Sequence, residues 1–139
     1  MQTNNAPALK EHQIYAEKVF SQGEFDVFAK VSGDNNPIHV DPEFSAGTRF
    51  GRTVSHGMLL YTVMWGQIQK HFPDSVQKKQ KLKFPSPTYA DDVMEIDLNV
   101  RPSNTTNIYS VEGVMRRKKD GETTCEFQAE FEYLGGLPC

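Results

Sequence analysis

Residues 55–68, Ser-His-Gly-Met-Leu-Leu-Tyr-Thr-Val-Met-Trp-Gly-Gln-Ile, decide the fold of this chain. At helical spacing their apolar residues cover most of the circumference instead of forming one stripe. These residues are Met58, Leu59, Leu60, Tyr61, Val63, Met64, Trp65 and Ile68. The stretch therefore predicts a helix that is buried nearly all round, beginning near Ser55 and ending before Pro73.

After this stretch the apolar residues recur with a period of two, which is typical of strands with one covered face. The inward positions expected are Gln80, Leu82 and Phe84, then Met94, Ile96, Leu98 and Val100, and finally Cys125, Phe127, Ala129, Phe131 and Tyr133. Residues 107–119 predict a further strand, and Asp120-Gly121 predicts a hairpin turn before the last one. The pattern predicts an antiparallel sheet covered by the apolar helix.

The N-terminal half indicates short helices. Ser21 and Glu24 have the spacing of a capping box, so a helix should start after Ser21 and end near Gly33. Asp41-Pro42 has the residue types of an N-cap and a first helical position. Residues 12–20 indicate one strand before these helices. The order of strand, helices and four strands predicts the α+β class.

Length and charge bound the possible functions. The chain has 139 residues, which is typical of one domain. We expect residues 1–11 to form a flexible N-terminal segment and residues 12–139 a single domain. Fifteen basic and 18 acidic residues give a net charge of −3. This balance argues against a nucleic-acid partner recognised through a strong overall positive field.

Signals for targeting are absent from the first twenty residues, which contain neither arginine nor a continuous apolar stretch. The longest apolar segment is too short to cross a membrane. Two cysteines, Cys125 and Cys139, cannot build a disulfide framework. We therefore expect a cytoplasmic protein with reduced thiols and no membrane partner.

The loop between Val31 and His39 is the richest in chemistry. Its residues Gly33, Asn35, Asn36 and Pro37 favour turns, and the loop holds one carboxylate and one imidazole. Because Asp34 and His39 differ in their ordinary pKa, such a pair suits acid–base work on one water. Two alternatives stay open: a purely structural Asx turn with a capping histidine, and a cation held by these two residues and Asp41.

The start of the apolar helix, Ser55-His56-Gly57, is a second candidate. Backbone N–H groups at a helix start lack partners within the helix, and the helix dipole adds partial positive charge there. Gly57 would let a ligand approach, so its N–H is a candidate donor to a developing oxyanion. The alternative is structural, with Ser55 as the N-cap and His56 as a packed residue.

Together, these segments resemble a known family. Residues 28–46, with their Gly-Asp-x-Asn-Pro-x-His core, resemble the hydratase 2 signature of MaoC-like (R)-specific enoyl-CoA hydratases. Residues 49–58 and 84–92 resemble the segments that follow in that family, so the resemblance covers about residues 12–134. It implies a hot-dog fold, in which a curved antiparallel sheet wraps a long buried helix. It also implies a homodimer with an acyl tunnel near the interface.

The resemblance further implies reversible syn hydration of a trans-2-enoyl thioester of coenzyme A or acyl carrier protein, with no cofactor and no metal. Asp34 and His39 match the catalytic pair, with His39 preferred as the base toward water. Gly57 matches the glycine whose N–H would bind the thioester oxygen. The residues expected to contact substrate, or to order the loop around it, are Asn36, Ser55, His56 and Met58.

Two departures from the family pattern affect the loops. Ser55 stands where the family commonly has alanine, and Ala90-Asp91-Asp92 replaces a Gly-Asp turn. Neither removes a catalytic residue. Because one fold can host several chemistries, two alternatives remain: an acyl-CoA thioesterase and a non-catalytic acyl-thioester-binding subunit.

Overall fold

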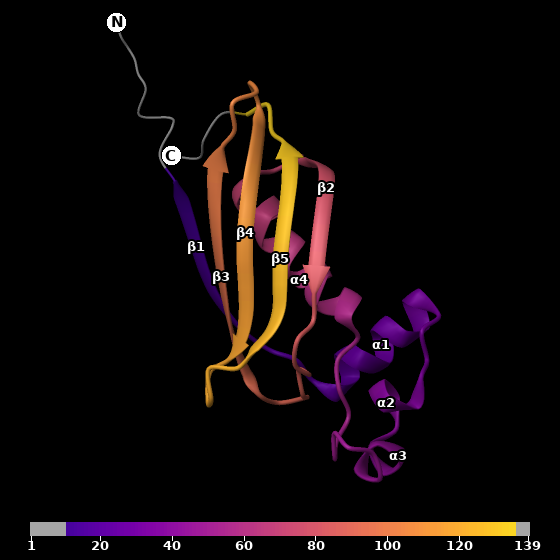
Figure 1. Cartoon of the computed structure of the whole chain (residues 1–139). Helices are drawn as coiled ribbons and strands as arrows, with labels where there is room; N and C mark the ends of the chain where they lie inside the picture. The colour runs from indigo at the N-terminus through magenta and orange to yellow at the C-terminus, as the bar shows by residue number, and fades with distance from the viewer. Residues whose placement is uncertain (1–10, 136–139) are drawn as a thin grey trace, which may run out of the picture.

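The computed structural model describes residues 11–135. Its elements are β1 (His12–Val19), α1 (Gln22–Ser32), α2 (Pro37–Val40), α3 (Pro42–Ala46), α4 (Gly57–His71), β2 (Val76–Lys83), β3 (Val93–Pro102), β4 (Ile108–Arg117) and β5 (Thr123–Glu132). Figure 1 shows α4 behind the sheet and the three short helices gathered near one end of it. The predicted α+β order and the helix-on-sheet arrangement of the hot-dog fold are confirmed.

The sheet has five strands in the order β1-β3-β4-β5-β2, and all neighbours are antiparallel. The alternation predicted for β3 and β5 is confirmed, since their inward residues from Met94 to Val100 and from Cys125 to Phe131 are buried. The predicted turn also forms, with Gly121 at φ 72°. The buried residues of β3 and β5 thus share one core cluster with those of α4.

Helix α4 begins and ends close to the predicted bounds, but its burial differs from the prediction. Its fully buried side chains form one stripe, namely Leu59, Leu60, Met64 and Ile68. Met58 is 48% exposed, while Tyr61, Val63 and Trp65 are half-buried. The expectation of burial nearly all round is therefore wrong for the described residues, because the sheet covers only one side of the helix.

Strand β2 departs most from its expected pattern. Gln80 is exposed, Leu82 packs half-buried against the core, and Phe84 lies beyond the strand end with 42% exposure. The physical reason is position, since β2 is an edge strand that pairs only with β5. An edge strand is less covered, and its alternation then no longer reports a buried face.

The N-terminal half follows its local signals. Both bonds of the Ser21–Glu24 capping box are present, and the Asp41 side chain caps α3. Helix α2 was not predicted, although its Asn36-Pro37 start carries the same signal as Asp41-Pro42. No helix within residues 11–135 is long and apolar enough to cross a membrane. Residues 1–10 of the expected flexible segment lie outside the described residues, and the single domain stays a prediction.

Candidate active site

The loop between α1 and α2 is built from short-range hydrogen bonds. Gly33 ends α1 in the left-handed region, at φ 82°, where a side chain would be strained. The Asp34 N–H then donates to Ser32 Oγ at 3.1 Å. The Ile38 N–H donates to Asn36 Oδ1 at 3.1 Å, which starts α2. These bonds fix the path of the chain on which Asp34 and His39 are mounted.

His39 is held by a neighbouring segment. Its Nδ1 donates to the Val54 carbonyl oxygen at 2.8 Å, and the Val54 N–H donates back to the Ile38 carbonyl oxygen at 3.0 Å. Because a carbonyl only accepts, the Nδ1 of His39 carries the proton. In neutral His39 the lone pair is therefore on Nε2, which makes this atom a proton acceptor.

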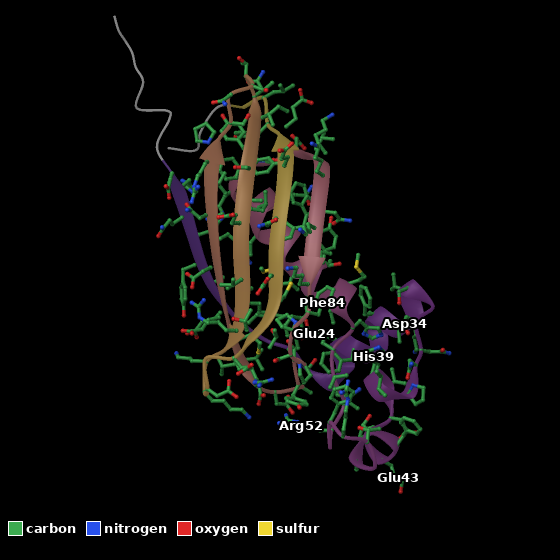
Figure 2. All side chains as sticks on the ribbon, in the orientation of Figure 1. Glu24, Asp34, His39, Glu43, Arg52 and Phe84 are labelled. Atoms are coloured by element: carbon green, nitrogen blue, oxygen red, sulfur yellow. The ribbon has the colours of Figure 1, made fainter. Side chains whose placement is uncertain are left out.

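Asp34 lies beside that acceptor. Its Oδ2 is 3.8 Å from His39 Nε2, and its side chain is 56% exposed whereas that of His39 is 10% exposed. Figure 2 shows the two residues on neighbouring parts of the helical end, with Phe84 close by. The separation exceeds a direct hydrogen bond, but one water about 2.8 Å from each atom can bond both. The predicted pairing of these two residues is thus present in the geometry.

His56 contacts both residues of the pair. Its Nε2 donates to the Asp34 backbone oxygen at 2.8 Å, and its ring stacks on His39 with centroids 3.9 Å apart. The Phe28 ring meets it edge-on at 4.9 Å. Burial lowers the pKa of His56 below its ordinary value, because desolvation disfavours the charged ring. Sequence reasoning placed His56 near substrate but gave no sign of this contact with Asp34.

A metal site fits this cluster less well than an acid–base pair. Ligand atoms of Asp34, His39 and His56 do lie within 4.8 Å of one another. However, the rings of His39 and His56 are stacked, and stacked imidazoles direct their nitrogen lone pairs side by side instead of toward a common point. Asp41, the third ligand considered from the sequence, instead accepts from the Phe44 N–H at 3.0 Å.

The start of α4 lies next to the pair. Its N-cap is His56, which makes no side-chain capping bond. Ser55 does not cap the helix either, since its Oγ donates to the His56 carbonyl oxygen at 2.9 Å. A Cβ atom on Gly57 would lie 2.8 Å from Cε2 of Phe84, so only glycine fits under that ring. The described residues thus leave the first N–H groups of α4 without a side-chain cap.

Two cavities flank the pair, and both are lined by Gly57 and Phe84. His39 lines a cavity of about 270 Å³, together with residues that include Arg49 and Ser55. Asp34 lines the other, of about 350 Å³, with Phe28, Ser32, His56 and Met58. Ser55, His56 and Met58 therefore border the expected substrate space, whereas Asn36 lines neither cavity and orders the loop. Their contact with substrate stays a prediction.

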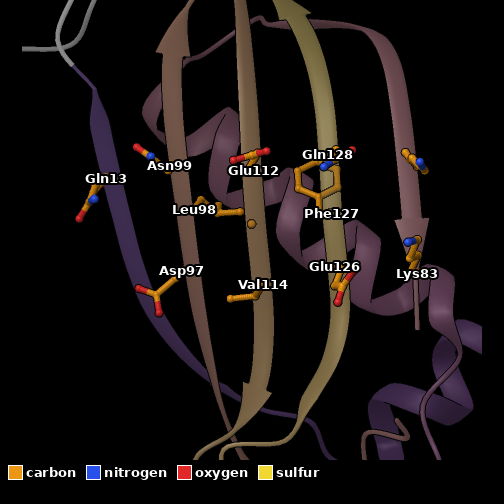
Figure 3. Close-up of a pocket in the computed structure, with 12 residues that line it drawn as sticks. Gln13, Lys83, Asp97, Leu98, Asn99, Glu112, Val114, Glu126, Phe127 and Gln128 are labelled. Atoms are coloured by element: carbon orange, nitrogen blue, oxygen red, sulfur yellow. The ribbon is translucent and has the colours of Figure 1, made fainter. Parts of the chain in front are cut away.

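A larger hollow of about 460 Å³ lies on the outer face of the sheet. Asn99, Glu112 and Gln128 form a row across β3, β4 and β5 there (Figure 3). Gly113 also lines this hollow, and a Cβ at this position would collide with the Leu98 side chain. The polar side chains that line this hollow are acidic, amide and lysine groups without a histidine. The hollow therefore has no acid–base pair like Asp34 and His39.

The sequence of this chain is similar to those of known proteins. A family model described as "MaoC like domain" matches residues 4–123. The mitochondrial 3-hydroxyacyl-(acyl-carrier-protein) dehydratase of Arabidopsis thaliana is 35% identical over 105 residues, covering 74% of this chain and 63% of the relative. The (R)-specific enoyl-CoA hydratase of Aeromonas caviae is 36% identical over 85 residues, covering 60% and 63%. The chain thus matches slightly under two thirds of each relative's length.

A solved structure extends the comparison to the fold. The structure titled (R)-hydratase from A. caviae involved in PHA biosynthesis superposes with a TM-score of 0.83 at 26% identity. The match covers 88% of this chain and 95% of that chain. This likeness confirms the hot-dog fold expected from the sequence.

Proposed function

Because the chain belongs to the MaoC-like domain family, we propose that it hydrates trans-2-enoyl thioesters reversibly, by syn addition of water, to (R)-3-hydroxyacyl thioesters. The observation that carries the proposal is the Asp34–His39 pair, whose Oδ2 and Nε2 atoms lie 3.8 Å apart beside the uncapped start of α4. The relatives named as hydratases and dehydratases support the same reaction class. The enzyme would be a hydro-lyase.

Both residues of the pair would take part in the proton transfers of the reaction. In hydration, the water oxygen bonds to C3, one water proton goes to His39 Nε2, and the proton of the Asp34 carboxyl goes to C2 on the same face, which leaves an Asp34 carboxylate beside a protonated His39. We assign His39 as the acceptor of the water proton because its Nδ1 is committed to Val54. Proton return between the two groups, across 3.8 Å, restores the starting state.

Gly57 would stabilise the charge that develops on the thioester oxygen. As water adds to C3, electrons move toward the thioester and an enolate forms. The N–H of Gly57 lies at the start of α4, where the helix dipole favours negative charge. One such donor is worth about 3 kcal/mol of the barrier in other enzymes. Hydration consumes only water besides the thioester and requires no cofactor.

We propose that the protein works as a homodimer on thioesters of coenzyme A or acyl carrier protein. Two features of the described residues support a second copy. Strand β2 is a sheet edge, paired only with β5. In addition, α4 leaves Met58, Thr62 and Gly66 exposed on one side. A second copy beside α4 would complete the burial that the sequence of this helix predicts. The cytoplasmic location stays a prediction.

The test is to mix the purified protein with crotonyl-CoA and follow the conjugated enoyl absorbance, with a thiol reagent in a parallel reaction. Loss of absorbance without free thiol supports the hydratase. Release of free thiol instead supports the thioesterase, because that reaction attacks C1 and frees the carrier. Tight binding of enoyl-CoAs of several lengths without any turnover supports the non-catalytic subunit and contradicts the proposal.

A further inference from the structure

The two residues of the candidate catalytic pair, Asp34 and His39, line different cavities. His39 lines one cavity and Asp34 the other, although their reacting atoms lie 3.8 Å apart. Gly57 and Phe84 are the residues that line both. A single thioester that uses Asp34, His39 and Gly57 together must therefore occupy space on both sides of the Phe84 ring.

The ring also stands close to where the thioester oxygen would bind. A Cβ placed on Gly57 would lie 2.8 to 3.1 Å from three ring atoms of Phe84. Since ordinary carbon contacts are about 3.5 to 4.0 Å, the ring rests directly on this glycine. Little space is left between Gly57 and Phe84 for substrate in this conformation.

The Phe84 side chain is partly exposed and outside the core, whereas the loop that carries it is held by hydrogen bonds. Its side chain is 42% exposed and does not belong to the core cluster. The loop backbone is anchored by the Ser55 N–H, which donates to the Thr88 carbonyl oxygen at 2.8 Å, and by Arg117, which donates to the Pro87 carbonyl oxygen at 2.6 Å. Movement is thus easiest about the side-chain bonds of Phe84, between staggered rotamers.

We propose that Phe84 is a specificity-determining gate, whose ring separates the His39 cavity from the Asp34 cavity and must turn aside to admit the acyl thioester. This inference rests on the proposed function. Every acyl thioester that uses the pair must displace the ring, and a longer or bulkier acyl chain requires a larger displacement. The size of the residue at position 84 therefore sets which acyl chains are processed.

The experiment compares kcat/KM for crotonyl-CoA and trans-2-octenoyl-CoA in the wild type, Phe84→Ala and Phe84→Trp. We expect Phe84→Ala to raise the octenoyl-to-crotonyl ratio about tenfold or more, in line with the discrimination that apolar pockets achieve. Phe84→Trp should lower the ratio. Phe44→Ala is the matched control, because Phe44 is 50% exposed and lines neither cavity.

The outcomes separate the gate from the proposed function. If the wild type hydrates crotonyl-CoA but the ratio is the same in Phe84→Ala and Phe84→Trp, the gate is wrong and the hydratase stands. If the wild type hydrates neither substrate, the proposed function fails and the gate fails with it. Calorimetric binding of octanoyl-CoA gives a readout without turnover, and the gate requires tighter binding in Phe84→Ala than in Phe44→Ala.

Discussion

Replacing Asp34 by asparagine should lower kcat while leaving the free energy of unfolding almost unchanged. The Asp34 side chain is 56% exposed, and its closest backbone donor, the Asn36 N–H, lies 3.4 Å from Oδ1. Asparagine keeps an oxygen at that position, so the free energy of unfolding should change by less than about 0.5 kcal/mol. Asparagine cannot exchange the proton, however. The loss of general acid–base catalysis should lower kcat by about 10²- to 10⁴-fold, which corresponds to roughly 3 to 5 kcal/mol of barrier.

The assay follows crotonyl-CoA hydration and chemical unfolding of the same preparations. Asp41→Asn is the matched control, since it makes the same substitution at the next aspartate along the chain and keeps a good N-cap for α3. It should retain wild-type activity. Adding His39→Gln to Asp34→Asn should cost little more than either change alone, because groups that act as a unit are not additive. Near-normal turnover by Asp34→Asn would refute the acid–base role.

Three further predictions test the surroundings of the pair. Burial lowers the pKa of His56 in the folded protein, so below about pH 6.5 the unfolded chain binds a proton more readily than the folded chain. The free energy of unfolding should therefore fall as the pH is lowered through this range. In denaturation experiments from acid to neutral pH, His56→Gln should reduce this dependence of the free energy of unfolding on pH. Burial raises the pKa of the Cys125 thiol to about 12, so this thiol should be unreactive in the folded chain. In a Cys139→Ser variant, a thiol reagent at about pH 8 should therefore react only after denaturant is added. Rapid reaction of the folded variant would contradict this. Gly57→Ala should lower kcat/KM for crotonyl-CoA about 10²-fold, because the added Cβ narrows the space between the Gly57 N–H and the Phe84 ring in which the thioester oxygen would bind. A Phe84→Ala background, which removes the facing ring, should restore most of that loss.

The elements predicted best from the sequence depend on neighbours along the chain. The Ser21–Glu24 capping box sets the start of α1, and alternation sets the buried faces of β3 and β5. In each case the signal and the structure lie within a few residues of each other. The same logic would have found α2, because Asn36-Pro37 repeats the cap-and-proline signal of Asp41-Pro42 that was used for α3.

Burial was harder to predict because it depends on what covers an element. The apolar residues of α4 predicted burial on every side, but the sheet of one chain covers only the stripe from Leu59 to Ile68. Gln80 alternates correctly within β2 and is nevertheless exposed at the sheet edge. Both differences occur where the described chain leaves an edge or a face uncovered. The amino-acid pattern cannot distinguish cover supplied by the same chain from cover supplied by another.

The pairing of Asp34 and His39 could be predicted from the sequence, but the contacts that orient the two residues could not. Asp34 and His39 share one loop, whereas the groups that orient them come from distant segments. Gln22 joins these segments, since its Nε2 donates to the His39 carbonyl oxygen at 2.9 Å and its Oε1 accepts from Thr53 Oγ1 at 2.5 Å. Val54 then fixes the tautomer of His39. Such contacts leave no periodic or spacing signal.

These contacts also explain why selectivity should be altered at Phe84 rather than at the pair. His39 is bonded through both its carbonyl oxygen and its ring, and His56 holds the Asp34 backbone at 2.8 Å. A change at any of these positions disturbs the proton-transfer geometry, in which a misplacement of about 1 Å can cost 10²-fold in rate. Phe84 contributes no hydrogen bond and borders both cavities. Substitution there can change which acyl chain fits while leaving the acid–base pair in place.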